Sequence, residues 1–104
     1  MAIVIRKAVQ KDIQIIQEIE KNIYNDPWPK VLFQLMLSRA NELFIVAANE
    51  EEILGYAIGE IEREQDIIMG HVLNLAVKEI WRNHGYGETL LNELEKNFIK
   101  KRKF

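Results

Sequence analysis

The sequence has 104 residues, of which 48% are hydrophobic and 29% are charged, and its net charge is −2. This length and balance predict a single globular domain over residues 1–104, and they exclude wholesale disorder and a broadly basic surface for nucleic acid. The chain has no cysteine and no apolar run near the ~18 residues of a membrane span, so we expect a cytoplasmic protein without disulfides, thiolate zinc sites or a membrane anchor.

The first part of the chain is expected to form a strand followed by two helices. Residues 2–8 have a β-branched centre, which favours a strand. Asp12 then stands where a helix N-cap would, before isoleucines at helical spacing. Two prolines end this helix, and a second one is expected from about Lys30. The apolar face of the second helix should hold Val31, Leu32, Leu35 and Met36.

Three strands and a helix are expected in the second part. Residues 43–48 and 53–62 are apolar runs joined by a polar turn, which predicts an antiparallel hairpin. Two glycines in the second run predict a bulge or the close approach of another group. Residues 67–77 are predicted as the third strand of a meander, and residues 88–101 as a helix. The order β-α-α-β-β-β-α predicts an α+β (mixed α/β) fold in which helices cover a mainly antiparallel sheet.

The segment 71–87 joins an apolar strand to a glycine-bearing turn that opens a helix. Within it, Arg82-Asn83-His84-Gly85-Tyr86-Gly87 follows the pattern Arg-x-x-Gly-x-Gly. Such a turn lets successive N–H groups converge on a pyrophosphate at a helix N-terminus, and the arginine adds charge. It is not a dinucleotide fingerprint or a nucleotide-binding phosphate loop, because no second βα unit and no Gly-Lys-Ser/Thr follows. The alternative is a glycine-rich strand–helix connection without a ligand.

The sequence resembles the GNAT superfamily of N-acetyltransferases, especially its protein N-terminal branch, which includes ribosomal-protein alanine acetyltransferases. The resemblance is carried by Arg6-Lys7-Ala8 with Asp12, by Pro27-Trp28, by Gly55-Tyr56, and by Asn74-Leu75-Ala76-Val77 followed by Arg82-x-x-Gly85-x-Gly87. It covers essentially all of this chain but only the N-terminal part of the family's fold. Members normally continue with a further strand, a helix and a strand pair, so we expect a truncated domain.

The resemblance implies transfer of an acetyl group from acetyl-CoA, the cosubstrate, to a primary amine. The expected acceptor is a protein N-terminal α-amine that attacks directly in a ternary complex, without a metal. Leu75, Ala76 and Val77 would pair with the pantetheine arm, and the Val77 N–H would polarise the acetyl carbonyl. The residues expected to wrap the pyrophosphate are Arg82, Asn83, His84, Gly85, Tyr86, Gly87 and Glu88. For His84 the alternative is a solvated loop position.

A general base is also implied, because only the free amine attacks. Some members carry a glutamate or tyrosine six residues before the position of Val77, and here that residue is His71. The alternative for His71 is a strand histidine that faces solvent. Tyr24, Trp28 and Asn74 are the candidate substrate-side residues. The alternative for Trp28 is a core position, and for Asn74 it is a hydrogen bond to neighbouring backbone.

Two alternatives to an active enzyme are a non-catalytic acetyl-CoA-binding remnant and a dimerising half-domain. In a truncated domain the strand at 67–77 would be an exposed apolar edge, and such edges pair with other strands. We therefore expect a homodimer through this edge, in addition to acetyl-CoA and an amine or peptide substrate as partners.

Overall fold

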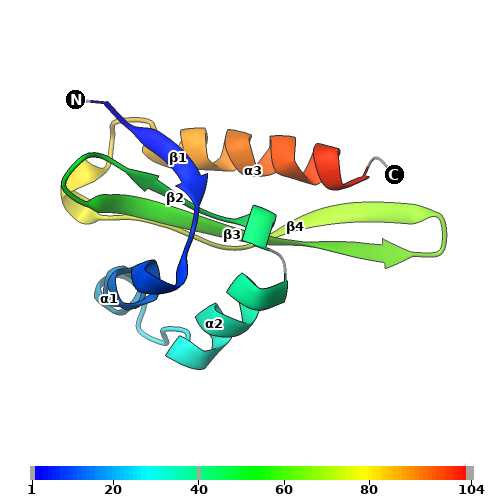
Figure 1. The fold of residues 1–104 in the computed structure, drawn as a ribbon, viewed down its shortest axis with the longest axis horizontal. Coiled ribbons are helices and arrows are strands. Elements are labelled where there is room, and N and C mark those ends of the chain that lie inside the picture. The colour runs from blue at the N-terminus through cyan, green and yellow to red at the C-terminus, as the bar shows by residue number, and fades with distance from the viewer. Residues whose placement is uncertain (1, 40, 103–104) are drawn as a thin grey trace.

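The computed structural model describes residues 2–39 and 41–102 (Figure 1). The described strands are β1 (Val4–Lys7), β2 (Phe44–Ala48), β3 (Ile53–Glu64) and β4 (Ile67–Val77). The described α-helices are α1 (Ile13–Ile23), α2 (Lys30–Arg39) and α3 (Tyr86–Arg102). The strands form one antiparallel sheet in the spatial order β1-β2-β3-β4. The expected element order and the α+β class are therefore confirmed.

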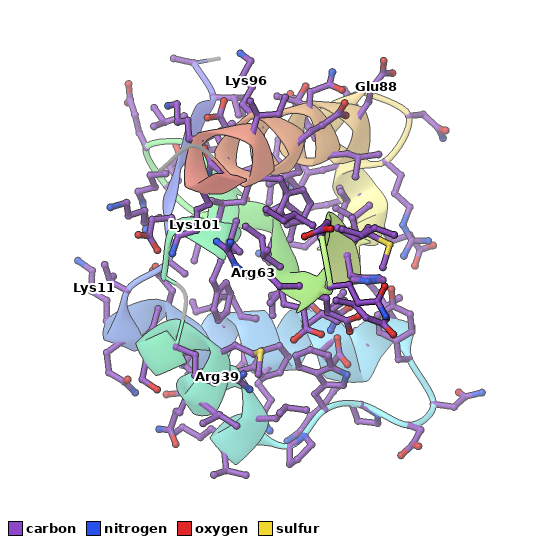
Figure 2. The ribbon with its side chains drawn as sticks, turned by 90° about the vertical axis from the view of Figure 1, so that its right-hand side faces the viewer. Lys11, Arg39, Arg63, Glu88, Lys96 and Lys101 are labelled. Atoms are coloured by element: carbon purple, nitrogen blue, oxygen red, sulfur yellow. The ribbon has the colours of Figure 1, made fainter. Side chains whose placement is uncertain are left out.

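The helices cover both faces of the sheet. In Figures 1 and 2, α1 and α2 lie on one face and α3 lies on the other. The core under α1 and α2 includes Ile13, Ile16, Ile19, Phe33, Phe44, Val46, Tyr56 and Ala76. The core under α3 includes Leu43, Ile45, Ala47, Ala57, Leu90 and Leu94. Strand side chains alternate between faces, so β2, which is buried on both, is a continuous apolar run. None of the described helices has the length and apolar character needed to cross a bilayer.

Asp12 precedes α1 as predicted, but its side chain does not cap that helix. The carboxylate instead accepts hydrogen bonds from the Arg6 guanidinium at 2.8 and 3.1 Å and from the Val9 N–H at 2.8 Å. Burial raises the pKa of Asp12, but these hydrogen bonds outweigh it and hold the pKa below its ordinary value. The contacts fasten β1 to the start of α1.

The expected face of α2 is only partly right. Val31 and Leu35 are exposed, whereas Phe33 is fully buried. The Phe33 ring lies 5.3 Å from the Trp28 ring and 5.9 Å from the Tyr56 ring, measured between centroids. Because an aromatic ring buries more apolar surface than a leucine, these contacts set the rotation of α2 against the sheet.

The hairpin of β3 and β4 projects beyond the rest of the sheet (Figure 1). Its pairing shifts register between Ile58 and Gly59, where Leu73 of β4 has no partner, so a bulge lies beside this glycine but on the neighbouring strand. The ring of Phe98 on α3 lies against Gly59 and Gly70: an added Cβ would stand 2.5 Å from Phe98 at the first and 2.6 Å at the second. The glycines therefore admit the close approach of an aromatic ring from α3.

Candidate functional site

The edge of β4 that faces away from β3 carries the first part of the site. Lys78 donates its N–H to a β3 carbonyl at 2.8 Å, and backbone groups alternate along a strand, so those of Leu75 and Val77 point outward. The outward carbonyls have side-chain partners: the Tyr24 hydroxyl donates to Leu75 at 2.8 Å, and Arg82 Nε donates to Val77 at 3.2 Å. The outward N–H groups have no hydrogen-bond acceptor within the described residues. This edge therefore offers donors to a ligand.

Ala76 differs from its two neighbours. It lies two residues before Lys78, whose N–H donates to β3, so by the same alternation its backbone groups face β3 and not outward. Of the three residues expected to pair with a pantetheine arm, only Leu75 and Val77 present backbone groups to a ligand. The sequence could not separate these three residues, because it does not show which backbone groups of β4 form hydrogen bonds with β3.

The turn between β4 and α3 is fixed by its own contacts. Asn83 and Gly85 have positive φ angles of 66° and 82°. A Cβ at Gly85 would meet nothing within 4 Å, so the backbone conformation and not the space favours glycine there. His84 donates its Nδ1–H to the Arg82 carbonyl at 2.8 Å, and its ring stacks on Tyr86 with centroids 5.6 Å apart. His84 thus holds the turn and keeps its Nε2 free of these contacts.

The N-terminus of α3 follows directly. Its first intrahelical bond runs from the Thr89 N–H to the Gly85 carbonyl at 3.0 Å, so the N–H groups of Tyr86, Gly87 and Glu88 have no acceptor within the helix. Figure 2 shows Glu88 on the outer side of α3, away from the sheet. The free donors and the positive end of the helix dipole favour an anion such as a phosphate.

A cavity of about 490 Å³ opens between the α1–α2 connection and β4. Its lining consists of Glu20, Tyr24, Asn25, Asp26, Trp28, Val72, Leu73, Asn74 and Leu75. The structure thus brings the three candidate substrate-side residues together, and Leu75 joins them to the β4 edge. Among the described lining residues there are two carboxylates and no lysine, arginine or histidine. No group of three or more described His, Asp or Glu side chains is placed to hold a metal ion.

Glu20 is a residue of this cavity that was not among the sequence candidates, and it is only 2% exposed. Its carboxylate accepts hydrogen bonds from the Tyr56 hydroxyl, from Asn74 Nδ2 at 2.8 Å and from the Trp28 N–H at 2.9 Å. Burial and the contact with Glu20 raise the pKa of Tyr56, so its hydroxyl stays protonated and donates. The available signal was a glutamate on the apolar stripe of α1, where an unpaired carboxylate would be costly.

His71 does not line the cavity. Its Nε2 lies 3.3 Å from Glu62 Oε2, and its side chain is partly exposed. It stands opposite Glu60 on β3 and directly precedes Val72, which is part of the cavity lining. The structure therefore places this histidine beside the cavity and not in its wall.

Residues 13–103 match the model of the Acetyltransferase (GNAT) family. Over 96 residues the chain is 32% identical to an uncharacterized N-acetyltransferase of Methanocaldococcus jannaschii, covering 92% of this chain and 59% of that protein. It is 30% identical over 95 residues to an N-alpha-acetyltransferase of Sulfolobus acidocaldarius, covering 84% of this chain and 56% of that protein. The chain therefore spans less than two thirds of the length of these relatives.

The fold is similar to a chain in the crystal structure of the NatC complex bound to Gag peptide and CoA, with a TM-score of 0.87. The match covers 98% of this chain and 70% of that chain, at 16% sequence identity. At this identity the likeness shows a shared fold.

Proposed function

Because the chain belongs to the GNAT family of acetyltransferases, we propose that it transfers an acetyl group from acetyl-CoA to a primary amine. The proposed acceptor is a protein N-terminal α-amine, which attacks directly in a ternary complex. The observation that carries the proposal is the β4 edge, where the outward N–H groups of Leu75 and Val77 lead into the turn before α3. The acceptor class is supported by the relative named an N-alpha-acetyltransferase and by a structural neighbour solved with a peptide and CoA.

In this proposal the pyrophosphate of acetyl-CoA lies at the turn. The backbone N–H groups of residues 83–88 would bind its oxygens, as at other helix N-termini. Arg82 would add charge through its terminal nitrogens, because its Nε already donates to the Val77 carbonyl. Three of these residues, His84, Gly85 and Tyr86, would act by shaping the turn as well as by their N–H groups.

The pantetheine arm would lie along the outer edge of β4. Leu75 and Val77 would donate N–H groups to it, with the Val77 N–H directed at the acetyl carbonyl. When the amine attacks, negative charge develops on that oxygen, and one such donor stabilises the transition state by about 3 kcal/mol. The C–S bond then breaks and CoA leaves as a thiolate. The nitrogen loses its second proton as the amide forms, and this proton neutralises the thiolate.

The acceptor would enter through the 490 Å³ cavity, past Tyr24, Trp28 and Asn74. The ammonium must lose a proton before its nitrogen can attack. His71 is the proposed base. Since His71 is not part of the cavity lining, it would take the proton through an intervening water.

Two measurements test the proposal. Calorimetric titration with acetyl-CoA should give binding, and an assay of CoA release should show turnover that depends on an added amine or peptide. Binding without turnover for any primary amine would favour the non-catalytic acetyl-CoA-binding remnant. Absence of both would reject the proposal.

We also propose a homodimer through the distal half of β4. This strand is an edge of the described sheet, and Ile67, Met69 and Val72 on it are exposed. Apolar edge strands tend to pair, and this half leaves Leu75 and Val77 available for a ligand. Light scattering at micromolar concentration should give twice the 12.2 kDa of the monomer, and a clean monomer would exclude the dimer.

A further inference from the structure

The carboxylate of Glu20 has hydrogen-bonding capacity that the described residues do not fill. An ionised carboxylate can accept about four hydrogen bonds. Glu20 Oε1 accepts two, from Tyr56 and Asn74, and Oε2 accepts one, from the N–H of Trp28. One acceptor position on Oε2 is therefore left, on a side chain that forms part of the cavity wall.

The charge of Glu20 also lacks a partner. None of the ion pairs found among the described residues includes it. A carboxylate that is 98% buried is costly without a cation, and three hydrogen bonds from neutral groups compensate only in part. The cavity wall adds a second carboxylate, Asp26, and no described cationic side chain.

The position of Glu20 ties this charge to the proposed reaction. Its partner Asn74 directly precedes Leu75, whose outward N–H lies on the proposed pantetheine edge. Tyr24, on the same cavity wall, donates to the Leu75 carbonyl. A group bound at Glu20 would therefore lie next to the strand along which the acetyl group is proposed to lie.

We propose that Glu20 receives the positively charged amine of the acceptor, and so selects acceptors that bind as primary ammonium ions. The inference rests on the proposed acetyl transfer and names a residue that recognises the positive charge of the acceptor. The ammonium supplies the missing cation and the missing hydrogen-bond donor in one group. The competing explanation is structural: Glu20 would serve only to tie α1 to β3, β4 and the segment before α2.

Paired peptides distinguish these explanations without turnover. The probes are tetra-alanine amide, whose only charge is its α-ammonium, and propionyl-trialanine amide, which lacks that amino group and is otherwise the same. Calorimetry in the presence of CoA, which cannot transfer an acetyl group, gives the affinity for each. We expect the wild-type chain to prefer the charged peptide by at least about tenfold, as a hydrogen bond to a charged group implies.

Glu20→Gln removes the charge and keeps the size of the side chain, so it should abolish the preference while CoA binding stays unchanged. Glu18→Gln is the matched control, since it removes an exposed carboxylate from the same helix and should leave the preference intact. A structural role would instead lower the thermal stability of Glu20→Gln and leave the preference in place. That result would overturn the proposal, as would equal affinity of the wild-type chain for both peptides.

Asp26→Asn decides the matter if Glu20→Gln does not fold. Asp26 is the other carboxylate of the described lining, and it is exposed, so its replacement should not disturb folding. If Asp26→Asn still prefers the charged peptide, Glu20 is supported as the residue that binds the ammonium. If the preference is lost, Asp26 binds the ammonium and the proposal is overturned. If CoA does not bind but the peptide preference persists, the proposed acetyl transfer fails and the cation selectivity of the cavity stands.

Discussion

The hydroxyl of Tyr24 donates a 2.8 Å hydrogen bond to the backbone carbonyl of Leu75, 51 residues further along the chain. The bond joins the residue after α1 to the outer edge of β4. It occupies an acceptor on that edge and leaves the neighbouring N–H for a ligand. Both residues also line the 490 Å³ cavity, so one hydrogen bond joins the proposed cofactor edge to the proposed acceptor wall.

Tyr24→Phe should separate these two effects. The ring stays, and loss of one exposed hydrogen bond should lower the free energy of unfolding by about 1 kcal/mol or less. The freed carbonyl changes the cavity wall, so we expect the KM for a peptide acceptor to rise several-fold. Steady-state kinetics with each substrate varied in turn checks this. A change confined to the KM for acetyl-CoA would contradict the placement of Tyr24 on the acceptor side.

His71→Gln tests the proposed base. Loss of a general base typically lowers kcat by about 100-fold or more, and we expect the KM for acetyl-CoA to change little. Glu62→Gln is the control, because it removes the carboxylate 3.3 Å from the ring and leaves the imidazole in place. If both variants lower kcat equally, the effect comes from the contact between His71 and Glu62, and His71 is not the base.

Gly85→Ala tests the backbone of the turn. The φ of Gly85 is 82°, where an alanine is strained by about 1–2 kcal/mol, although no atom lies within 4 Å of the added Cβ. We expect lower stability in chemical denaturation and weaker binding of acetyl-CoA in calorimetry. Gly87→Ala serves as the comparison for stability: its Cβ would meet Val77 at an ordinary 3.8 Å, and Gly87 is not among the glycines with positive φ. Equal destabilisation by both changes would contradict the conformational argument.

Asp12 should give the protein a stability that depends on pH. Its pKa is lowered in the folded chain, so its contribution is fully present above the unfolded value of about 3.9 and is lost as pH falls through the folded pKa. Asp12→Asn should therefore cost about 2 kcal/mol at pH 7 and less below pH 3. Urea denaturation at pH 7, 4 and 3 should show the free energies of unfolding of the wild-type chain and of Asp12→Asn becoming more similar as the pH falls. Asp66→Asn, in the exposed β3–β4 turn, should show no such pattern.

Gly70→Ala should expose the close packing of α3 on the hairpin. The new Cβ would lie 2.6 Å from the Phe98 ring, and such overpacking costs about 2 kcal/mol. Phe98→Leu removes the facing ring, so the double variant should lose less stability than the sum of the two single changes. A double-mutant cycle of thermal or urea unfolding measures this coupling. If the two single changes in unfolding free energy simply add in the double variant, the Phe98 ring can move away from the new Cβ without a loss of stability.

Local patterns predicted most of the fold. The bounds expected for the third strand of the meander agree with β4, because its apolar run ends at polar residues on both sides. β3 runs two residues further than expected, since Gln65 adopts a φ of 55° and tightens the turn. The buried face of α2 was only partly predicted, because it depends on how Phe33 meets rings from other segments of the chain.

The geometry of the candidate site could be predicted where one continuous segment forms it. The strand, turn and helix from β4 to α3 follow one another in sequence, and their glycine and arginine positions are visible there. Glu20 was not predictable, because its donors lie 8, 36 and 54 residues away and only the fold brings them together. Tyr24, Trp28 and Asn74 lie around one cavity, and their contact with a substrate stays a prediction.

The separate cores on the two faces of the sheet bear on how the ligands would influence each other. α3 packs on one core, whereas the proposed acceptor cavity lies beside α1 and the α1–α2 connection, on the face of the other core. Acetyl-CoA should slow amide hydrogen exchange mainly in α3, and a peptide mainly in α1. β4 sends Ala76 into one core and packs Val77 against the other, so it is the strand through which binding of one ligand would change affinity for the other. If the first ligand makes β4 more rigid, the second should bind more tightly. The order in which acetyl-CoA and the peptide bind would then depend on this strand.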